Sequence, residues 1–328
     1  MHPKYRNCTI APQQDFGVGE LPGAGASVSV AAVVVLYYPN KVQVTRLIDS
    51  VASQVERIYA VDNTPSWDSN MPDTLARIPH KIDYRANGFN AGLASAQNAG
   101  ISSAVQEGHT HVLLLDQDSY LPEHAVEGLL SAERSLLCSG TEVAAVGPVF
   151  IDEKSGQRSH AVRHSGLRVR WHVISPEQTE PMETDYLIAS GSLIRSSVLK
   201  RVGLMRDELF IDWVDAEWSY RARNFGLAAY VIPTVEMKHN VGDATGNFMG
   251  RPINLHNPVR NYYIVRNAVY LMQNRRMSWR WRVTMLMYIP KYILVHSWLS
   301  RNRWISFMQM LGGLRDGVTR TMKPFTAI

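Results

Sequence analysis

The chain has 328 residues, 45% of them hydrophobic, so it can bury a large core in one or two domains. Its formal net charge of +5 is only moderately basic, and we expect no nucleic acid partner. Two cysteines, Cys8 and Cys138, are too few for a disulfide framework and lack the paired spacing of a zinc site. Because neither a signal peptide nor a membrane span is recognisable, we expect a cytoplasmic protein.

Strands alternate with helices along the first half of the chain. A Gly/Pro-rich leader, residues 1–27, precedes the first run of small and β-branched residues. Such runs predict buried strands over 29–39, 55–66, 81–90, 109–119 and 142–151, and helical spacing predicts helices over 40–54, 91–108 and 123–137. This alternation is typical of an α/β fold with an open, mostly parallel, Rossmann-like sheet and helices on both faces.

Polar side chains collect where these strands end, and the carboxyl edge of such a sheet is where ligands bind. The residues concerned are Tyr37, Tyr38, Asp62, Asn63, Asn87, Asp116 and Asp118. A dinucleotide or a nucleoside triphosphate is disfavoured, because the glycine-rich stretch 17–27 precedes the first strand instead of following it, and no Gly-Lys-Ser/Thr occurs. A nucleotide sugar fits better.

Asp116 and Asp118 follow a buried strand in "HVLLLDQDS", and two carboxylates so close repel each other unless something positive lies between them. A magnesium or manganese ion that neutralises a diphosphate would meet this need. Capping of the next helix is the alternative.

A second acidic stretch, "ELFIDWVDAEWSYRARNFG", holds Asp212, Asp215 and Glu217 among aromatic residues before a predicted helix. Capping explains acids at a helix N-terminus, but partial burial would also raise a carboxylate pKa, as a general base requires. The following predicted strand ends at His239, a reasonable metal ligand at that position.

Several segments, in order, resemble family 2 glycosyltransferases of the GT-A fold, and within them the bacterial rhamnosyltransferases that use dTDP-L-rhamnose. The matching segments are "VVVLYYP", "AVDNTPS", "NGFNAGLASAQNAGI", "LLLDQDS", "YLIASGSLI", "ELFIDWVDAEWSYRA" and "HNPVRNYYIVRN". They extend from about Val33 to Asn267. The resemblance implies a GT-A fold and glycosyl transfer.

The resemblance also implies which residues bind the nucleotide. Asp62 matches the acid that reads the nucleobase, with Tyr37 and Asn63 in the same pocket. Asn90 and Asn98 lie in the small-residue segment that brings a helix close to the nucleotide, although helix–sheet packing alone also explains that segment.

For the metal and the chemistry, the resemblance implies that Asp118 binds Mg²⁺ or Mn²⁺ directly, that Asp116 contacts ribose or metal, and that His239 is a third ligand. Asp215 matches the catalytic base. Many relatives have Asp where this chain has Trp213, so Asp212 is the second candidate for that role.

The implied reaction is inverting transfer of L-rhamnose from dTDP-β-L-rhamnose to a hydroxyl of a glycolipid or a lipid-linked saccharide, as in polysaccharide or rhamnolipid synthesis. We assign residues 28–267 to the GT-A domain, with a nucleotide-sugar half (28–150) and an acceptor half (151–267). One alternative is a sugar-nucleotide nucleotidyltransferase, but such an enzyme needs a Gly-rich signature after the first strand, and the segment found there, "YYPNKVQV", has none. The other is a non-catalytic basic membrane-binding protein, which leaves the acids unexplained.

The last quarter of the chain has a different composition. Residues 251–328 contain thirteen Lys/Arg, one acid (Asp316) and four of the eight tryptophans. Helical spacing interrupted at Pro290 and Lys291 predicts two amphipathic helices that lie in a membrane interface. We therefore expect residues 268–328 to attach the protein to the inner face of the cytoplasmic membrane; packing on the catalytic domain or dimerisation is the alternative.

Overall fold

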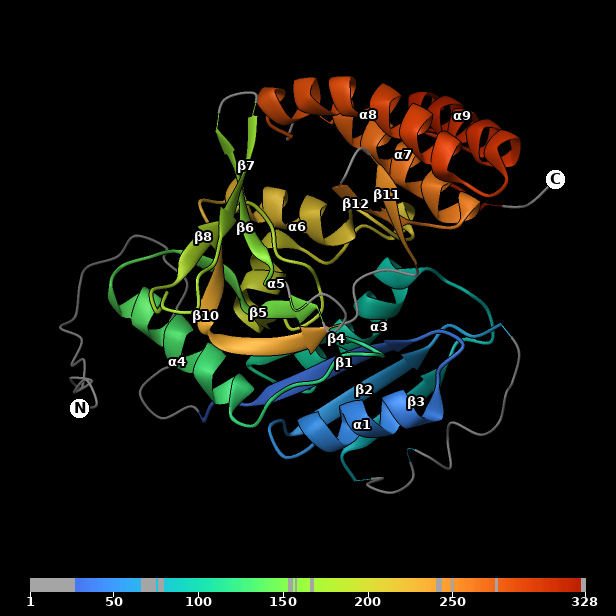
Figure 1. Ribbon diagram of the computed structural model, residues 1–328. Coiled ribbons are helices and arrows are strands. Elements are labelled where there is room, and N and C mark those ends of the chain that lie inside the picture. Colours follow the sequence, from blue (N-terminus) through green and yellow to red (C-terminus); the bar gives the residue numbers. More distant parts are fainter. Residues whose placement is uncertain are drawn as a thin grey trace.

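The computed structural model describes residues 27–65, 75, 80–152, 156, 158–165, 168–239, 244–248, 251–274 and 277–325, so the predicted leader lies outside it except for Ser27. An eight-stranded sheet crosses the middle of the molecule in the order β3-β2-β1-β4-β9-β5-β10-β8 (Figure 1). These strands are β1 (Val30–Leu36), β2 (Arg57–Asp62), β3 (Ile82–Ala86), β4 (His111–Asp116), β5 (Val143–Asp152), β8 (Met182–Thr184), β9 (Leu193–Arg195) and β10 (Ala228–His239).

The sheet is mostly parallel, as the alternation of elements predicts. β1 pairs in parallel with β2 and β4, β2 with β3, and β5 with β10. The short strand β9 is antiparallel to both β4 and β5, and β8 is antiparallel to β10. The carboxyl ends of β1, β2 and β4 therefore lie side by side at one edge.

Helices cover both faces of the sheet, and β1 shows why. All seven of its residues are buried, and alternate side chains enter two different cores. Val34 packs with α1 (Lys41–Val51) and α4 (Ala125–Cys138) on one face. Val33 lies in the core on the other face, which also contains side chains of α3 (Leu93–Gln106), α5 (Ser196–Val202) and α6 (Val214–Arg223). The predicted GT-A fold class is confirmed.

Local signals set several helix boundaries. The Asn40 side chain accepts hydrogen bonds from the N–H groups of Val42 and Gln43 (3.0 and 3.2 Å), so α1 begins where the sequence predicts. The sequence analysis did not predict two antiparallel ribbons, β6–β7 (His160–Ser165 and Arg168–Val173) and β11–β12 (Ala244–Phe248 and Arg251–Leu255), or the one-turn helix η1 (Asp207–Leu209).

Three helices complete the chain: α7 (Pro258–Met272), α8 (Trp279–Leu299) and α9 (Arg303–Thr319). The predicted interruption at Pro290 is wrong, because α8 continues through it and ends at Leu299. Pro290 is exposed, so water can satisfy the carbonyl that loses its partner, while Met285 before it and Ile293 after it are both buried in the core. Core packing before and after Pro290 thus outweighs the tendency of proline to end a helix.

The three helices form a compact layer at the opposite end of the molecule from α1 and β3 (Figure 1). On α9, a Cβ at Gly313 would lie 2.5 Å from the Tyr262 carbonyl oxygen, and one at Gly317 2.6 Å from that of Arg266. The missing side chains let α9 touch the backbone of α7. Within the described residues, no helix has the length and apolar character to cross a membrane.

Candidate active site

A cavity of about 720 Å³, which we call the central cavity, opens at the carboxyl ends of β1 and β4. The start of α3 and the segments 186–189 and 210–216 also line it. It brings together predicted site residues from both halves of the GT-A domain: Tyr37, Asn63, Asn90, Asp116, Asp118, Asp212 and Asp215.

Gln117, between the two acids, fastens the end of β4 to the end of β1. Its side-chain oxygen accepts from the Tyr37 N–H (2.9 Å), and its amide nitrogen donates to the Tyr37 carbonyl (3.2 Å). Asp116 and Asp118, on either side in sequence, line the cavity. The middle residue of the Asp-Gln-Asp triplet is therefore structural.

Asp62 is buried at the end of β2 and does not line the cavity, although its neighbour Asn63 does. The Asp62 carboxylate accepts from the Thr64 N–H (2.8 Å) and the Tyr84 hydroxyl (2.9 Å). The Asn63 amide donates to the Gly92 carbonyl (2.9 Å). The Asp62 side chain thus fixes the segment after β2 against β3, and the Asn63 side chain fixes that segment against the loop at Gly92.

Asn90 and Asn98 have different places. Asn90 lines the cavity and accepts from the Gly92 N–H (3.0 Å). Gly92 has a φ of 87°, and a Cβ there would lie 2.6 Å from the Phe210 ring, so glycine suits the close approach of these two loops. Asn98 is outside the lining: its amide donates to the Met205 carbonyl (2.8 Å) and the Asp207 carboxylate (2.6 Å), which ties α3 to the segment just before the acidic stretch.

His239 is the last residue of β10, and its side chain is not among those the structure describes. Its neighbour Lys238 forms a β-bridge with Tyr120, two residues beyond Asp118. The backbone at His239 therefore runs beside the segment that carries the two acids. Among the side chains that are described, no group of three or more His, Cys, Asp or Glu forms a metal site.

The acidic stretch has an unusual backbone. Phe210, Asp212 and Trp213 have φ values of 65°, 62° and 64°, a left-handed region that non-glycine residues rarely adopt. Such a conformation is unfavourable and persists only where surrounding contacts hold it. The path of residues 208–213, which we call the acidic loop, therefore depends on its neighbours.

Helix α7 supplies those contacts. The amide nitrogen of the buried Asn267 lies 2.8, 2.8 and 3.0 Å from the carbonyl oxygens of Leu209, Ile211 and Asp212. The guanidinium of the buried Arg266 donates to the carbonyls of Glu208 and Leu209 (2.9 and 3.0 Å). Two adjacent side chains thus bind four carbonyls of the acidic loop.

The two candidate bases differ in their partners. Arg260 pairs with Asp212 through two nitrogens, at distances of 3.0 and 3.2 Å. Asp215, in the first turn of α6, accepts backbone hydrogen bonds from Ala189 (3.2 Å) and Ala216 (2.9 Å).

The pKa of Asp215 is raised from 3.8 to about 6, chiefly because burial disfavours its charged form. The negative charges of Asp116 and Asp212 raise it further. The carboxyl therefore titrates near neutral pH, where a group can both accept and release a proton.

Glu217, the third acid of the stretch, is a structural residue. It is buried in α6 and forms ion pairs with Arg206 (2.8 Å) and Arg221 (3.1 Å). Its charge is therefore balanced inside the fold and away from the cavity lining.

The sequence analysis gave no role to Gln117, Arg260, Arg266 or Asn267. A signal for two of them was present: Arg260 and Asn267 are seven residues apart in a helical segment, so they lie on one face, two turns apart. No local pattern marks Gln117, because its partner Tyr37 is 80 residues away.

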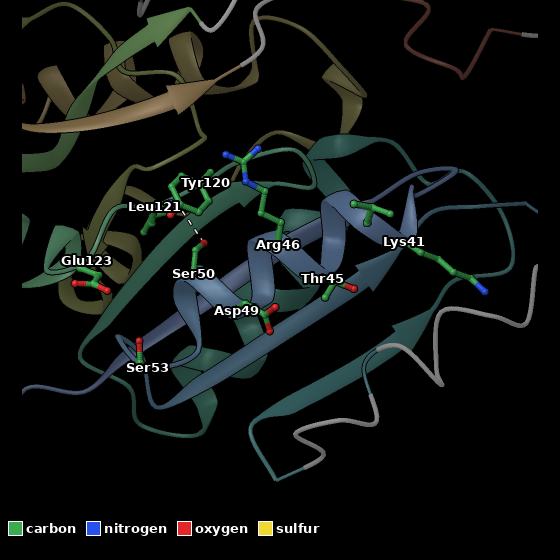
Figure 2. Close-up of a pocket in the computed structure, with 10 residues that line it drawn as sticks. Lys41, Thr45, Arg46, Asp49, Ser50, Ser53, Tyr120, Leu121 and Glu123 are labelled. Atoms are coloured by element: carbon green, nitrogen blue, oxygen red, sulfur yellow. Dashed lines mark hydrogen bonds between the residues drawn. The ribbon is translucent and has the colours of Figure 1, made fainter.

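A second, shallower depression of about 590 Å³ lies between α1 and the segment after β4 (Figure 2). Arg46 stacks over the Tyr120 ring at 4.5 Å, and the Leu121 N–H donates to Ser50 (3.3 Å). None of the described residues lining this depression also lines the central cavity. We therefore place the active site in the central cavity.

The role of Asn267 is testable. Asn267→Ala removes the donor shared by three carbonyls of the acidic loop, so the free energy of unfolding in urea should fall by about 1–3 kcal/mol or more. Gln273→Ala, on the same helix, is the control. Its amide binds the Gly317 carbonyl on α9 (2.7 Å) and is only partly buried, so water replaces it and the loss should stay below about 1 kcal/mol. Equal small losses would contradict the role given to Asn267.

Comparison with known proteins identifies the family. Residues 32–203, more than half of the chain, match the family described as Glycosyl transferase family 2. The chain is 34% identical over 250 residues to the dTDP-rhamnosyl transferase RfbF of Shigella flexneri, covering 75% of this chain and 80% of that protein. It is 20% identical over 298 residues to the low-salt glycan biosynthesis hexosyltransferase Agl10 of Haloferax volcanii, covering 89% and 92%.

Solved structures share the fold. The S. aureus TarS fragment 1–349 in complex with UDP-GlcNAc has a TM-score of 0.56 at 13% identity, with 90% of this chain and 83% of that one covered. GalNAc-T7 with UDP, GalNAc and Mn²⁺ has a TM-score of 0.55 at 14% identity, and this chain spans 58% of its length. With the family match and the 34% identical relative, the conclusion is that this chain belongs to glycosyltransferase family 2.

Proposed function

We propose that the protein is an inverting rhamnosyltransferase that transfers L-rhamnose from dTDP-β-L-rhamnose to a hydroxyl of a glycolipid or a lipid-linked saccharide. The observation that carries the proposal is the central cavity, where strand-end residues Asn63, Asp116 and Asp118 face a carboxyl with a raised pKa, that of Asp215. The name of the Shigella relative, a dTDP-rhamnosyl transferase, supports the choice of donor.

The reaction is a single displacement. Asp215 takes the proton of the acceptor hydroxyl as that oxygen forms a bond to the anomeric carbon of rhamnose. The bond from that carbon to the diphosphate breaks on the opposite face, and dTDP leaves with the bonding electrons. Attack from the opposite face inverts the configuration, so a β-linked donor gives an α-L-rhamnoside.

Asp215 suits the role of base better than Asp212. Both oxygens of the Asp212 carboxylate already accept hydrogen bonds from the Arg260 guanidinium, so this carboxylate is engaged in an ion pair. Asp215, by contrast, has a pKa raised by burial to about 6. The bound Asp212 instead adds to the negative potential that raises the pKa of Asp215.

Asp116 and Asp118 fit a divalent cation, because both line the cavity and carboxylate oxygens suit Mg²⁺ and Mn²⁺. We propose His239 as a third ligand from the position of its backbone beside the segment that follows Asp118. When bound, the ion stabilises the charge that develops on the departing diphosphate. GalNAc-T7, which shares the fold, was solved with UDP and Mn²⁺.

For the nucleotide, we propose that Tyr37, Asn63 and Asn90 form the walls of the pocket, as their places in the cavity lining support. We also propose that Asp62 reads the pyrimidine; because its carboxylate is buried just outside the lining and accepts from Thr64 and Tyr84, the base would have to reach it beside these partners. Asn98 contributes by holding α3 to Met205 and Asp207, just before the acidic loop.

Donor and metal binding can be measured together. Saturating dTDP with Mn²⁺ should raise the melting temperature of the wild-type protein, because a ligand that binds only the native state stabilises it. EDTA should remove most of this shift, and Asp118→Ala should abolish it. An unchanged shift in EDTA would rule out the metal role, and the absence of any shift with dTDP would rule out the proposed donor.

The base is tested by two isosteric substitutions. Asp215→Asn should lower the rate of dTDP release from dTDP-rhamnose by about 10²-fold or more, while the melting shift with dTDP persists. Because its pKa is raised in the folded state, ionised Asp215 destabilises the native protein above pH 6. At pH 8 the Asp215→Asn variant should therefore melt at a higher temperature than the wild type. Asp212→Asn should retain more activity; the reverse order would assign the base to Asp212.

We further propose that α8 and α9 hold the enzyme on an anionic membrane surface, where a lipid-linked acceptor lies. The buried side of α8 carries Trp281, Met285 and Ile289, and its opposite side is also apolar but exposed. The exposed apolar residues of the two helices include Trp279, Leu286, Met287, Leu294, Trp298, Trp304, Ile305 and Met308.

Charge supports lipid as the occupant of this face. The same two helices and the turn between them also carry basic residues that are at least partly exposed: Arg280, Arg282, Lys291, Arg301 and Arg303. The one acid of residues 251–328, Asp316, already accepts hydrogen bonds from Arg315 and Tyr262 (2.8 Å each). Each Lys or Arg near an anionic leaflet contributes about 1 kcal/mol, and tryptophans favour the headgroup level.

Vesicle sedimentation tests the attachment. The full chain should bind vesicles that contain phosphatidylglycerol, less so at high salt. The double substitution Leu286→Glu and Leu294→Glu should weaken binding at least tenfold, about 1.4 kcal/mol. Val42→Glu, at a 77% exposed residue of α1, should have no effect. Equal binding by all variants would contradict the proposal, as would a dimer of the wild type that ignores vesicles and dissociates in the double variant.

A further inference from the structure

We infer that α8 forms one wall of a subsite for an uncharged sugar ring of the acceptor, next to the ring that receives rhamnose. This inference rests on the proposed function, because it assumes that the central cavity transfers a sugar to a saccharide. It gives α8 a second role besides membrane attachment.

The subsite is a cavity of about 310 Å³ between α7, α8 and the acidic loop, a volume at the lower end of the roughly 300–1,000 Å³ of small-molecule sites. Asp212, Trp213 and His256 line both this cavity and the central one. The two spaces therefore adjoin, and a saccharide with one ring beside Asp215 can place its next ring against α8.

The lining suits a sugar. Tyr288, Tyr292 and His296 recur every four residues and so form one stripe along α8. The Tyr288 and Tyr292 ring centroids are 5.6 Å apart, and those of Tyr292 and His296 are 3.8 Å apart. Aromatic rings offer flat apolar faces to the C–H groups of a sugar, and their polar tips can bind its hydroxyls.

The polar groups of this cavity favour a neutral ligand over an anion. The charge of Asp212 is balanced by Arg260. His296 is more than nine-tenths buried, and burial together with His256 lowers its pKa to about 4, so its ring is neutral near pH 7. Its Nδ1 is buried without a hydrogen-bond partner, which is unfavourable unless a ligand or water supplies one.

Contacts with α7 and the acidic loop hold this wall in place. The Tyr292 hydroxyl donates to Asn261 on α7 (2.7 Å). Trp281, one turn before Met285, packs edge-on against Trp213 of the acidic loop with 5.5 Å between ring centroids. Helix α8 is therefore fixed to the segment that leads into Asp215, and a ring bound against α8 is positioned relative to the base.

The test uses the full chain with dTDP and Mg²⁺, and a panel of octyl glycosides as probes: octyl α-L-rhamnoside, octyl β-D-glucoside and octyl N-acetyl-β-D-glucosaminide. Saturation-transfer NMR should detect ring protons of at least one probe. Tyr288→Ala and His296→Ala should each weaken that binding at least tenfold, about 1.4 kcal/mol. The melting shift with dTDP should stay unchanged in both, which shows that the fold and the donor site are intact.

Phe225→Ala is the matched control, because Phe225 lies at the end of α6 with 41% exposure against 42% for Tyr288. It should bind the probe as the wild type does. Failure of every probe to bind the wild type, or equal binding by the α8 variants, would overturn the subsite. Failure of dTDP to shift the melting temperature would instead overturn the proposed function, so the two failures are distinguishable.

Discussion

The hydrogen bonds from α7 to the acidic loop are the constraint on which the active site depends. Three residues of this loop, Phe210, Asp212 and Trp213, adopt left-handed conformations that are unfavourable for them. Asn267 and Arg266 hold the loop by its carbonyls, and Arg260 holds the Asp212 side chain. The loop leads directly into α6, so these contacts decide where Asp215 lies.

The same loop joins the two halves of the cavity and the C-terminal helices. Phe210 occupies the space that a Cβ would take at Gly92, beside the predicted nucleotide residues. Trp213 packs against Trp281 of α8. The acidic loop therefore contacts the proposed donor side at Gly92 and the proposed membrane-facing helices at Trp281. It also leads to Asp215, the proposed base. The last quarter of the chain therefore packs directly on the loop that leads to Asp215, in addition to the role we propose for it at the membrane.

Local patterns predicted the strands and helices of the first half, because runs such as Val30–Leu36 are buried on both faces and need no distant partner to be recognised. They also predicted the clustering of Asp116 and Asp118 at the strand ends. What they missed depends on contacts distant in sequence. Examples are the Gln117 clamp on Tyr37, the pairing of Asp212 with Arg260, and the packing that carries α8 through Pro290. The places of Asp62 and Asn98 outside the cavity lining also follow from tertiary contacts.

We propose that the partly buried Asp215, positioned by the contacts of α7 with the acidic loop, is the base of the transfer reaction. The pH dependence of dTDP release from dTDP-rhamnose tests it most directly, with donor affinity measured at each pH to separate chemistry from binding. Because burial raises the pKa of Asp215 to about 6, the carboxyl is protonated below that pH and cannot accept a proton. We expect a rate that falls about tenfold per pH unit below pH 6. A rate that stays constant down to about pH 4, near the ordinary pKa of Asp, would contradict it.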